Sequence, residues 1–153
     1  MKLGKGKKKY NLVCLFDVLY HKYISSDEKV LSKVFKILKR GGNLCITDCA
    51  MPLLWSWHDN KVMARERYYL KDLEIKLQKV GFIIEKKSYI FFSLFPLFII
   101  NRMLGKFFQF STIPRLPPLF NNIFISIYKL EAFFLRYVSF PIGSSLIILA
   151  KKP

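Results

Sequence analysis

The two histidines of this sequence and one of its aspartates, Asp59, are the residues best suited to acid–base chemistry. His21 follows an apolar run, and because imidazole titrates near neutral pH it is a candidate general base, although a lone histidine is as often a surface residue. His58 and Asp59 are adjacent, and a carboxylate beside an imidazole can hold the ring in one orientation. We therefore take His21, His58 and Asp59 as candidate catalytic residues.

Aromatic and cationic side chains flank the His58–Asp59 pair in the sequence. Trp55 could stack on a substrate or anchor the loop on the core, since an indole ring buries a large area in either case. Arg67 and Tyr68 could face an anionic substrate group or the solvent, and spacing alone does not decide between them. We expect Trp55, Arg67 and Tyr68 to form the rim of a substrate site.

A zinc site can be considered for Cys45, Cys49 and His58 on residue types alone. The two cysteines lie four positions apart around the end of an apolar run, and no fourth ligand follows at the spacing of a zinc finger. We predict no metal site.

The cysteines and the apolar runs indicate where the chain resides. Cys14, Cys45 and Cys49 are odd in number and lie in apolar segments, as expected of reduced thiols in the cytosol. The Lys-rich start precedes only a short apolar stretch, too short for a signal peptide. The longest apolar run, residues 90–100, falls short of the about 20 residues that a membrane-spanning helix needs. We expect a cytoplasmic protein.

The net charge is +16, with most of the 26 basic residues being Lys. Such a charge favours anionic partners, namely nucleic acid, acidic lipid head groups or a phosphorylated substrate, without choosing among them. A compositional bias of the genome toward Lys, Ile, Phe and Asn explains it equally well. Nucleic acid ranks last, because few of the basic residues are Arg and no recognition motif is present.

The first half of the chain alternates between strand and helix. Residues Tyr10 to Phe16 form a nearly continuous apolar run that predicts a strand buried on both faces. A helix follows, with a capping box from Ser25 and Glu28 and a last turn closed by Lys39-Arg40 and Gly41-Gly42. Leu44 to Thr47 is the next strand. This βαβ unit predicts two parallel strands and a right-handed crossover.

The polar, aromatic stretch from Met51 to Tyr69 leaves the carboxyl end of the second strand, where open α/β sheets place their ligands. A helix with Leu70, Leu73, Leu77 and Val80 on one face then ends at Gly81, and a strand starts at Phe82. We expect one domain over 1–153, with strand and helix alternation over 10–90, a Phe-rich helical insertion over 91–138 and a final strand within 139–153.

The insertion contains a turn rich in proline (Pro114, Pro117, Pro118) and a helix with a regular apolar stripe, composed of Phe120, Ile123, Phe124, Ile127, Leu130, Phe134 and Val138. It could form an interfacial membrane element with Arg102, Lys106 and Arg115 at head-group level, or a lid over a hydrophobic acceptor. A helical cap over the sheet edge is the preferred interpretation, because stripes at helical spacing usually face a core.

The chain resembles the class I S-adenosylmethionine-dependent methyltransferases. The resemblance rests on Asp17-Val18-Leu19 and His21 after a strand, on Leu38-Lys39-Arg40-Gly41-Gly42 at the end of a helix, on Leu54-Trp55-Ser56-Trp57-His58-Asp59, on Arg67-Tyr68, and on the tail Pro141-Ile142-Gly143-Ser144-Ser145-Leu146. It covers essentially the whole chain. Departures from the family pattern occur at Tyr20, Arg40, Ala64 and Glu66.

The resemblance implies a fold and a cofactor. The fold is an incomplete Rossmann-like α/β sheet made of the later strands, with S-adenosylmethionine as cofactor and Phe16, Asp17 and Val18 beside its methionine portion; Asp17 could instead cap the turn after its strand. The family binds the cofactor mainly through an earlier Gly-rich loop and an acidic residue. Gly4 and Gly6 follow no strand and cannot form that loop.

These observations together predict a methyltransferase, or a truncated remnant of one, that acts on a small or lipid-linked acceptor. Weak or no cofactor binding is expected of this chain alone. The alternative is a non-catalytic basic module that binds an acidic membrane surface or a partner chain that supplies the missing strands.

Overall fold

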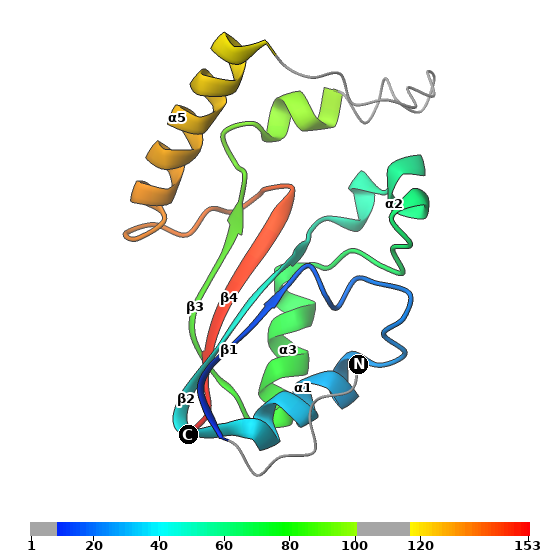
Figure 1. The fold of residues 1–153 in the computed structure, drawn as a ribbon, viewed down its shortest axis with the longest axis vertical. Coiled ribbons are helices and arrows are strands. Elements are labelled where there is room, and N and C mark those ends of the chain that lie inside the picture. Colours follow the sequence, from blue (N-terminus) through cyan, green and yellow to red (C-terminus); the bar gives the residue numbers. More distant parts are fainter. Residues whose placement is uncertain (1–8, 101–116) are drawn as a thin grey trace.

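The computed structural model describes residues 9–100 and 117–153. Gly4, Gly6, Arg102, Lys106, Pro114 and Arg115 lie outside these ranges. The described chain forms a mixed α/β fold with one open sheet (Figure 1). Its elements are β1 (Tyr10–Phe16), α1 (Asp27–Ile37), β2 (Leu38–Cys49), the 3-10 turn η1 (Pro52–Leu54), α2 (Trp57–Lys61), α3 (Leu70–Val80), β3 (Ile83–Ile90), α5 (Pro118–Phe134) and β4 (Ser145–Lys151).

The sheet has four strands in the order β1-β2-β4-β3. β1 and β2 are parallel, as predicted, with Leu15 opposite Ile46. β4 is antiparallel to both of its neighbours, β2 and β3. The carboxyl ends of β1, β2 and β3 therefore lie at one end of the sheet, which is also where α2 and α5 lie (Figure 1).

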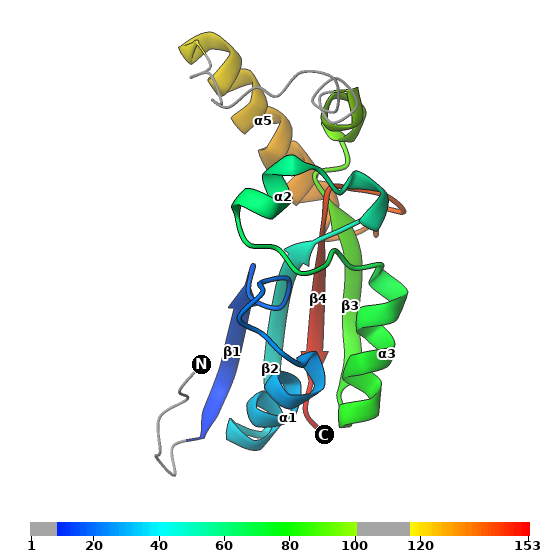
Figure 2. The ribbon, with the colours of Figure 1, turned by 90° about the vertical axis from the view of Figure 1, so that its right-hand side faces the viewer.

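Helices α1 and α3 cover one face of the sheet (Figure 2). Their apolar stripes pack on alternate residues of the central strands, and the core contains Leu31, Val34, Leu44, Ile46, Leu73, Leu77, Leu146 and Ile148. α3 ends as predicted, because Gly81 adopts the left-handed conformation (φ 103) that closes a helix. Strand alternation thus sends one set of side chains into this core and the other set to the opposite face.

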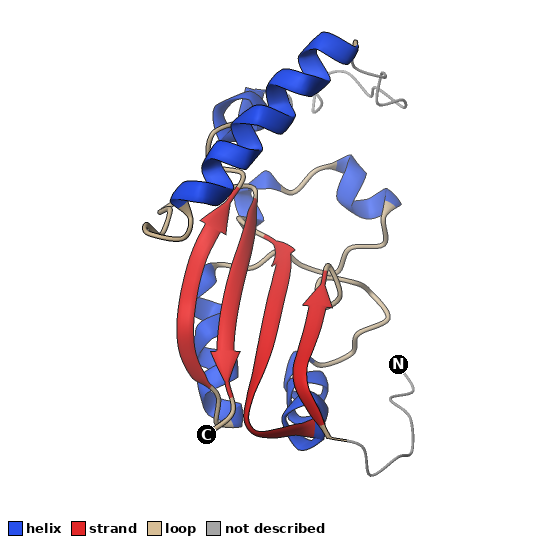
Figure 3. Cartoon of the chain, turned by 60° about the vertical axis from the view of Figure 1, so that its left-hand side comes forward, coloured by secondary structure: helices blue, strands red, loops and turns tan. Residues whose placement is uncertain are grey.

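The opposite face of the sheet carries no helix of the described ranges (Figure 3). Leu12, Cys14 and Phe16 of β1 point to this side, and all three are exposed. β1 is also an edge strand. The prediction of a strand buried on both faces is therefore wrong for β1, because only one of its faces has a packing partner among the described residues.

The start and end of α1 differ from the prediction. The capping residue is Ser26, whose side chain accepts a hydrogen bond from the Lys29 backbone N–H, and not Ser25. The helix ends at Ile37, and Leu38 already belongs to β2. Gly41, with a φ of 74, and Gly42, which lies against the carbonyls of Tyr10 and Asn11, form an irregularity in the β1–β2 pairing. Gly42 permits the close approach of the two strands, and Gly41 supplies a left-handed backbone conformation in open space. Neither residue ends a helix.

α5 does not cap the sheet edge. Its apolar stripe was expected to face a core, but five of its seven residues are exposed, namely Phe120, Ile123, Leu130, Phe134 and Val138, and Phe124 and Ile127 are only half-buried. The helix extends beyond the end of the sheet (Figures 1 and 3). No helix of the described ranges is both long and apolar enough to cross a bilayer.

Candidate functional site

Two parallel strands end side by side and bring two carboxylates together. Asp17 directly follows β1, and its backbone N–H donates to the carbonyl of Thr47 on β2 at 2.9 Å. Asp17 has a positive φ of 52, which few non-glycine residues adopt and which is often found at functional sites. Its side chain is exposed. A ligand at the end of the sheet could therefore reach it.

Asp48, near the end of β2, is completely buried. Its Oδ2 accepts the backbone N–H groups of Leu19 at 2.9 Å and Tyr20 at 3.3 Å. Burial raises the pKa of Asp48 to about 7, although these backbone hydrogen bonds oppose the rise and the carboxylate of Asp17 adds to it. Asp48 was not among the predicted site residues. Its position immediately after the predicted strand Leu44–Thr47 was the available signal.

Several acidic groups influence the pKa of the Tyr20 hydroxyl. Burial raises its pKa, and the charges of Cys49, Asp17, Asp48 and Asp59 add to the shift. Of these carboxylates, Asp59 is paired with Arg67 and Asp48 has a pKa of about 7, whereas Asp17 is exposed. A cationic or partly positive group would be stabilised beside Asp17.

Ligand atoms of Asp17, Asp48 and Cys49 lie within 4.8 Å of one another. We assign no metal to this group, because the oxygens of Asp48 already accept backbone N–H groups. Burial also raises the pKa of the Cys49 thiol to about 11, so it is protonated at neutral pH. Among the described residues, Cys45 and His58 do not belong to this group.

The predicted cofactor residues Phe16, Asp17 and Val18 have different environments. Phe16 and Asp17 are exposed, whereas Val18 is half-buried and packs against the core. The first two can contact a ligand at the sheet end. Val18 contributes mainly to positioning the loop.

His21 is half-buried in the loop between β1 and α1. Its Nδ1 accepts the backbone N–H of Tyr23 at 3.3 Å, and the two rings stack with centroids 4.9 Å apart. Accepting at Nδ1 places the proton of a neutral imidazole on Nε2. A general base at His21 would have to give up this contact, so its catalytic role stays a prediction.

The segment that carries Trp55, His58 and Asp59 folds into a short capped helix, α2. Ser56 is its N-cap, and Asp59 completes a capping box by accepting the Ser56 N–H at 2.8 Å. Asp59 is buried, whereas His58 is exposed and Trp55 half-buried. Asp59 contacts Ser56 and Arg67. The pairing of His58 with Asp59 stays a prediction.

Arg67 and Tyr68 do not form a solvent-facing rim, because both side chains are buried. Arg67 pairs with Asp59, and the Tyr68 hydroxyl contacts the buried Asp27 carboxylate at 3.1 Å. Burial, together with the carboxylates of Asp27 and Glu66, raises the pKa of Tyr68 well above its ordinary range. Because this segment is polar and aromatic, the sequence alone did not indicate that Arg67 and Tyr68 are buried structural residues.

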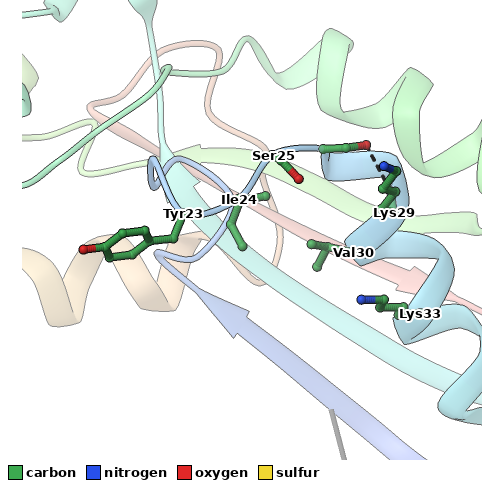
Figure 4. A pocket seen from close by; sticks show the side chains of 7 residues that line it. Tyr23, Ile24, Ser25, Lys29, Val30 and Lys33 are labelled. Atoms are coloured by element: carbon green, nitrogen blue, oxygen red, sulfur yellow. Dashed lines mark hydrogen bonds between the residues drawn. The ribbon is translucent and has the colours of Figure 1, made fainter. Parts of the chain in front are cut away.

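A shallow pocket lies elsewhere, between the loop after β1 and the first turns of α1 (Figure 4). Tyr23, Ile24, Lys29, Val30 and Lys33 line it, together with two serines. None of the predicted site residues lines it. The acidic end of the sheet, rather than this pocket, is the candidate site.

The sequence matches no protein-family model and no curated protein. Solved structures do match. A phosphoethanolamine N-methyltransferase 2 from Haemonchus contortus in complex with S-adenosyl-L-methionine is 17% identical, with a TM-score of 0.53 over 94% of this chain. A Thermotoga maritima methyltransferase described as a possible histamine N-methyltransferase is 15% identical, with a TM-score of 0.57 over 99%. The chain spans 33% and 60% of these two proteins.

These similarities establish that the chain has a class I S-adenosylmethionine-dependent methyltransferase fold. The same fold also occurs in the cyclase SpnF, which is 15% identical with a TM-score of 0.54 over 99% of this chain and 54% of its own. Because one fold can carry different reactions, the reaction has to be argued from the site.

Proposed function

We propose that this chain is part of an S-adenosylmethionine-dependent methyltransferase that acts on a small or lipid-linked acceptor. The observation that carries the proposal is the exposed carboxylate of Asp17 beside the buried Asp48, whose Oδ2 accepts the backbone N–H groups of Leu19 and Tyr20. The two residues lie where the parallel strands β1 and β2 end. Ligands of open α/β sheets bind at such carboxyl ends.

S-adenosylmethionine supplies a methyl group on a positively charged sulfonium, which becomes a neutral thioether when the acceptor's electron pair takes the methyl carbon. The exposed carboxylate of Asp17 can bind the positive end of such a cofactor, and buried Asp48 fixes the loop from Leu19 to Tyr20 through two backbone hydrogen bonds. The residues of this chain thus act by positioning and by charge. Proton removal from the acceptor is proposed for His21.

The described part of the site is incomplete. No glycine of the described ranges lies in the turn after β1 or β2, where a backbone could closely approach a cofactor. Among the described strands β1 has a neighbour on one side only, and it exposes the side chains of Leu12, Cys14 and Phe16. We propose that a strand–turn–helix segment rich in glycine, from the same polypeptide or another, pairs with β1 and completes the cofactor site.

Titration calorimetry with S-adenosylhomocysteine tests this proposal. The chain of 153 residues should show no saturable binding at sub-millimolar concentration. A version that includes a segment able to pair with β1 should bind, and Asp17→Asn should weaken that binding while the surface control Asp72→Asn leaves it unchanged. Low-micromolar binding by the chain alone would show that the site is already complete. Failure of the completed version to bind would exclude the methyltransferase function itself.

A further inference from the structure

Cys14 and Cys45 are register partners on the neighbouring parallel strands β1 and β2. Neighbouring strands lie about 4.8 Å apart, and residues in register on them point to the same face of the sheet. That face carries no helix of the described ranges (Figure 3). A backbone separation of this size falls within the Cα distances of about 4.4–6.8 Å that a disulfide spans.

The two thiols differ in exposure but lie close together. Cys14 is exposed and Cys45 is half-buried. Burial raises the pKa of the Cys45 thiol, and the negative charge of a Cys14 thiolate adds to the rise. The second effect requires that the two sulfur atoms are near neighbours, because screening limits the range of such a charge. Cys14 is therefore the thiol that a small oxidant reaches from solvent, and Cys45 is the thiol beside it.

Cys49 lies on the same face of β2 but is too far along the strand to pair with Cys14. It follows Cys45 by four residues, which corresponds to about 13 Å along a strand. Two cysteines whose Cα atoms are more than about 7 Å apart cannot be bridged without backbone movement. The same limit applies to Cys45 and Cys49. The strand register thus leaves Cys14 and Cys45 as the pair of free cysteines within disulfide distance.

We propose that Cys14 and Cys45 form a site of reversible oxidation, at which a hydroperoxide converts the two thiols into a disulfide between β1 and β2. The Cys14 thiolate attacks one peroxide oxygen, the O–O bond breaks, and the leaving hydroxide takes up the thiol proton as water. The Cys45 sulfur then attacks the resulting sulfenic sulfur, and the hydroxyl leaves with the Cys45 proton as a second water. Each sulfur loses one electron, and the peroxide gains both.

Mass-spectrometric peptide mapping of the folded chain after treatment with hydrogen peroxide tests the proposal. The free thiols should fall from three to one per chain, with a disulfide joining Cys14 to Cys45 and Cys49 still alkylated by iodoacetamide after unfolding. Excess glutathione should restore both thiols, because exposed disulfides are the readily reduced ones. Cys14→Ser should abolish the link. Cys49→Ser is the matched control and should leave it unchanged.

Oxidation in concentrated urea separates the effect of strand register from chance pairing. In the unfolded chain the shorter loop closes more readily, so Cys45–Cys49 should replace Cys14–Cys45 as the main link. The same link in the folded and unfolded chains would overturn the proposal, because register would then not select the pair. So would a link through Cys49 in the folded chain, a disulfide between two molecules through Cys14, or oxidation of Cys14 to a sulfinic acid without any link.

Discussion

Asp59 and Arg67 form a buried ion pair between the start of α2 and the strand-like segment that precedes α3. The Oδ1 atom of Asp59 lies 2.7 Å from Nη2 and 2.8 Å from Nε of Arg67. Nη1 of Arg67 donates to the carbonyl of Ala50 at 2.9 Å, directly after β2. This pair fixes the path of the chain around the end of β2, so these two residues position the candidate site rather than contact a substrate.

The Asp59–Arg67 pair leads to a first prediction. Arg67→Ala leaves the Asp59 carboxylate buried without its guanidinium partner, which should lower the free energy of unfolding by about 3–5 kcal/mol. Urea unfolding measures this change. Arg136→Ala, at an exposed position, should change it by no more than about 0.5 kcal/mol. Similar small effects for both variants would mean that Arg67 is not engaged as described.

The raised pKa of Asp48 predicts how stability depends on pH. The folded chain holds a proton on this carboxyl up to about pH 7, whereas the ordinary pKa is 3.8. The contribution of the protonated Asp48 carboxyl to the free energy of unfolding is therefore complete below pH 3.8. It is lost as the pH rises through about 7. Between about pH 5 and pH 8 the loss should amount to roughly 2–3 kcal/mol.

Asp48→Asn removes the titrating group and tests this dependence. The difference in unfolding free energy between the wild type and the variant should shift in the variant's favour as the pH rises from 5 to 8. Asp72→Asn, in the first turn of α3, serves as the control at another acidic site. Parallel pH profiles of the unfolding free energy for the wild type and Asp48→Asn would contradict the conclusion that the buried Asp48 carboxyl is neutral.

Local patterns in the sequence were sufficient to predict several elements. The apolar spacing and Gly81 gave the helix α3, and the strand–helix–strand alternation gave the parallel pair β1 and β2. These elements depend on interactions within short segments. The position of β4 between β2 and β3 was not predicted, because it depends on pairing between residues as distant as Asn43 and Lys151.

The site was harder to predict than the fold for a related reason. Asp17 at a strand end was found, since strand ends are visible in the sequence. Asp48 was missed, and Arg67 and Tyr68 were assigned to a rim although they are buried. Polar residues in an irregular segment look solvent-exposed until their partners are known, and the partner Asp27 of Tyr68 lies far away in the sequence.

The open edge of β1 predicts self-association of the chain. Backbone groups of β1 that no described strand pairs lie beside the exposed Leu12 and Phe16, and they should promote strand pairing between molecules. Light scattering coupled to size exclusion should show species larger than a monomer as the concentration rises. Leu12→Lys should reduce them, whereas Leu53→Lys, at an exposed position in η1, should not. A monodisperse monomer at all concentrations would argue against an edge that requires a partner.

The connection into β4 depends on a close contact at Gly143. A Cβ atom there would lie 2.2 Å from the carbonyl oxygen of Ile90, so Gly143→Ala must displace the backbone of β3. We expect a loss of about 2 kcal/mol or more in unfolding free energy. Gly41→Ala, which has open space but a φ of 74, should cost only about 1 kcal/mol. Thermal unfolding of both variants provides the measurement, and equal losses would refute the steric explanation.

The place of β4 in the sheet also has a consequence for how the protein is made. A ribosome produces β2 and β3 well before residues 145–151, yet β4 is the strand that hydrogen-bonds to both of them. Until β4 is synthesised, β3 has no strand partner among the described elements. The nascent chain must therefore keep an unpaired strand away from other chains until residues 145–151 have been made, which makes chaperone binding at this stage advantageous.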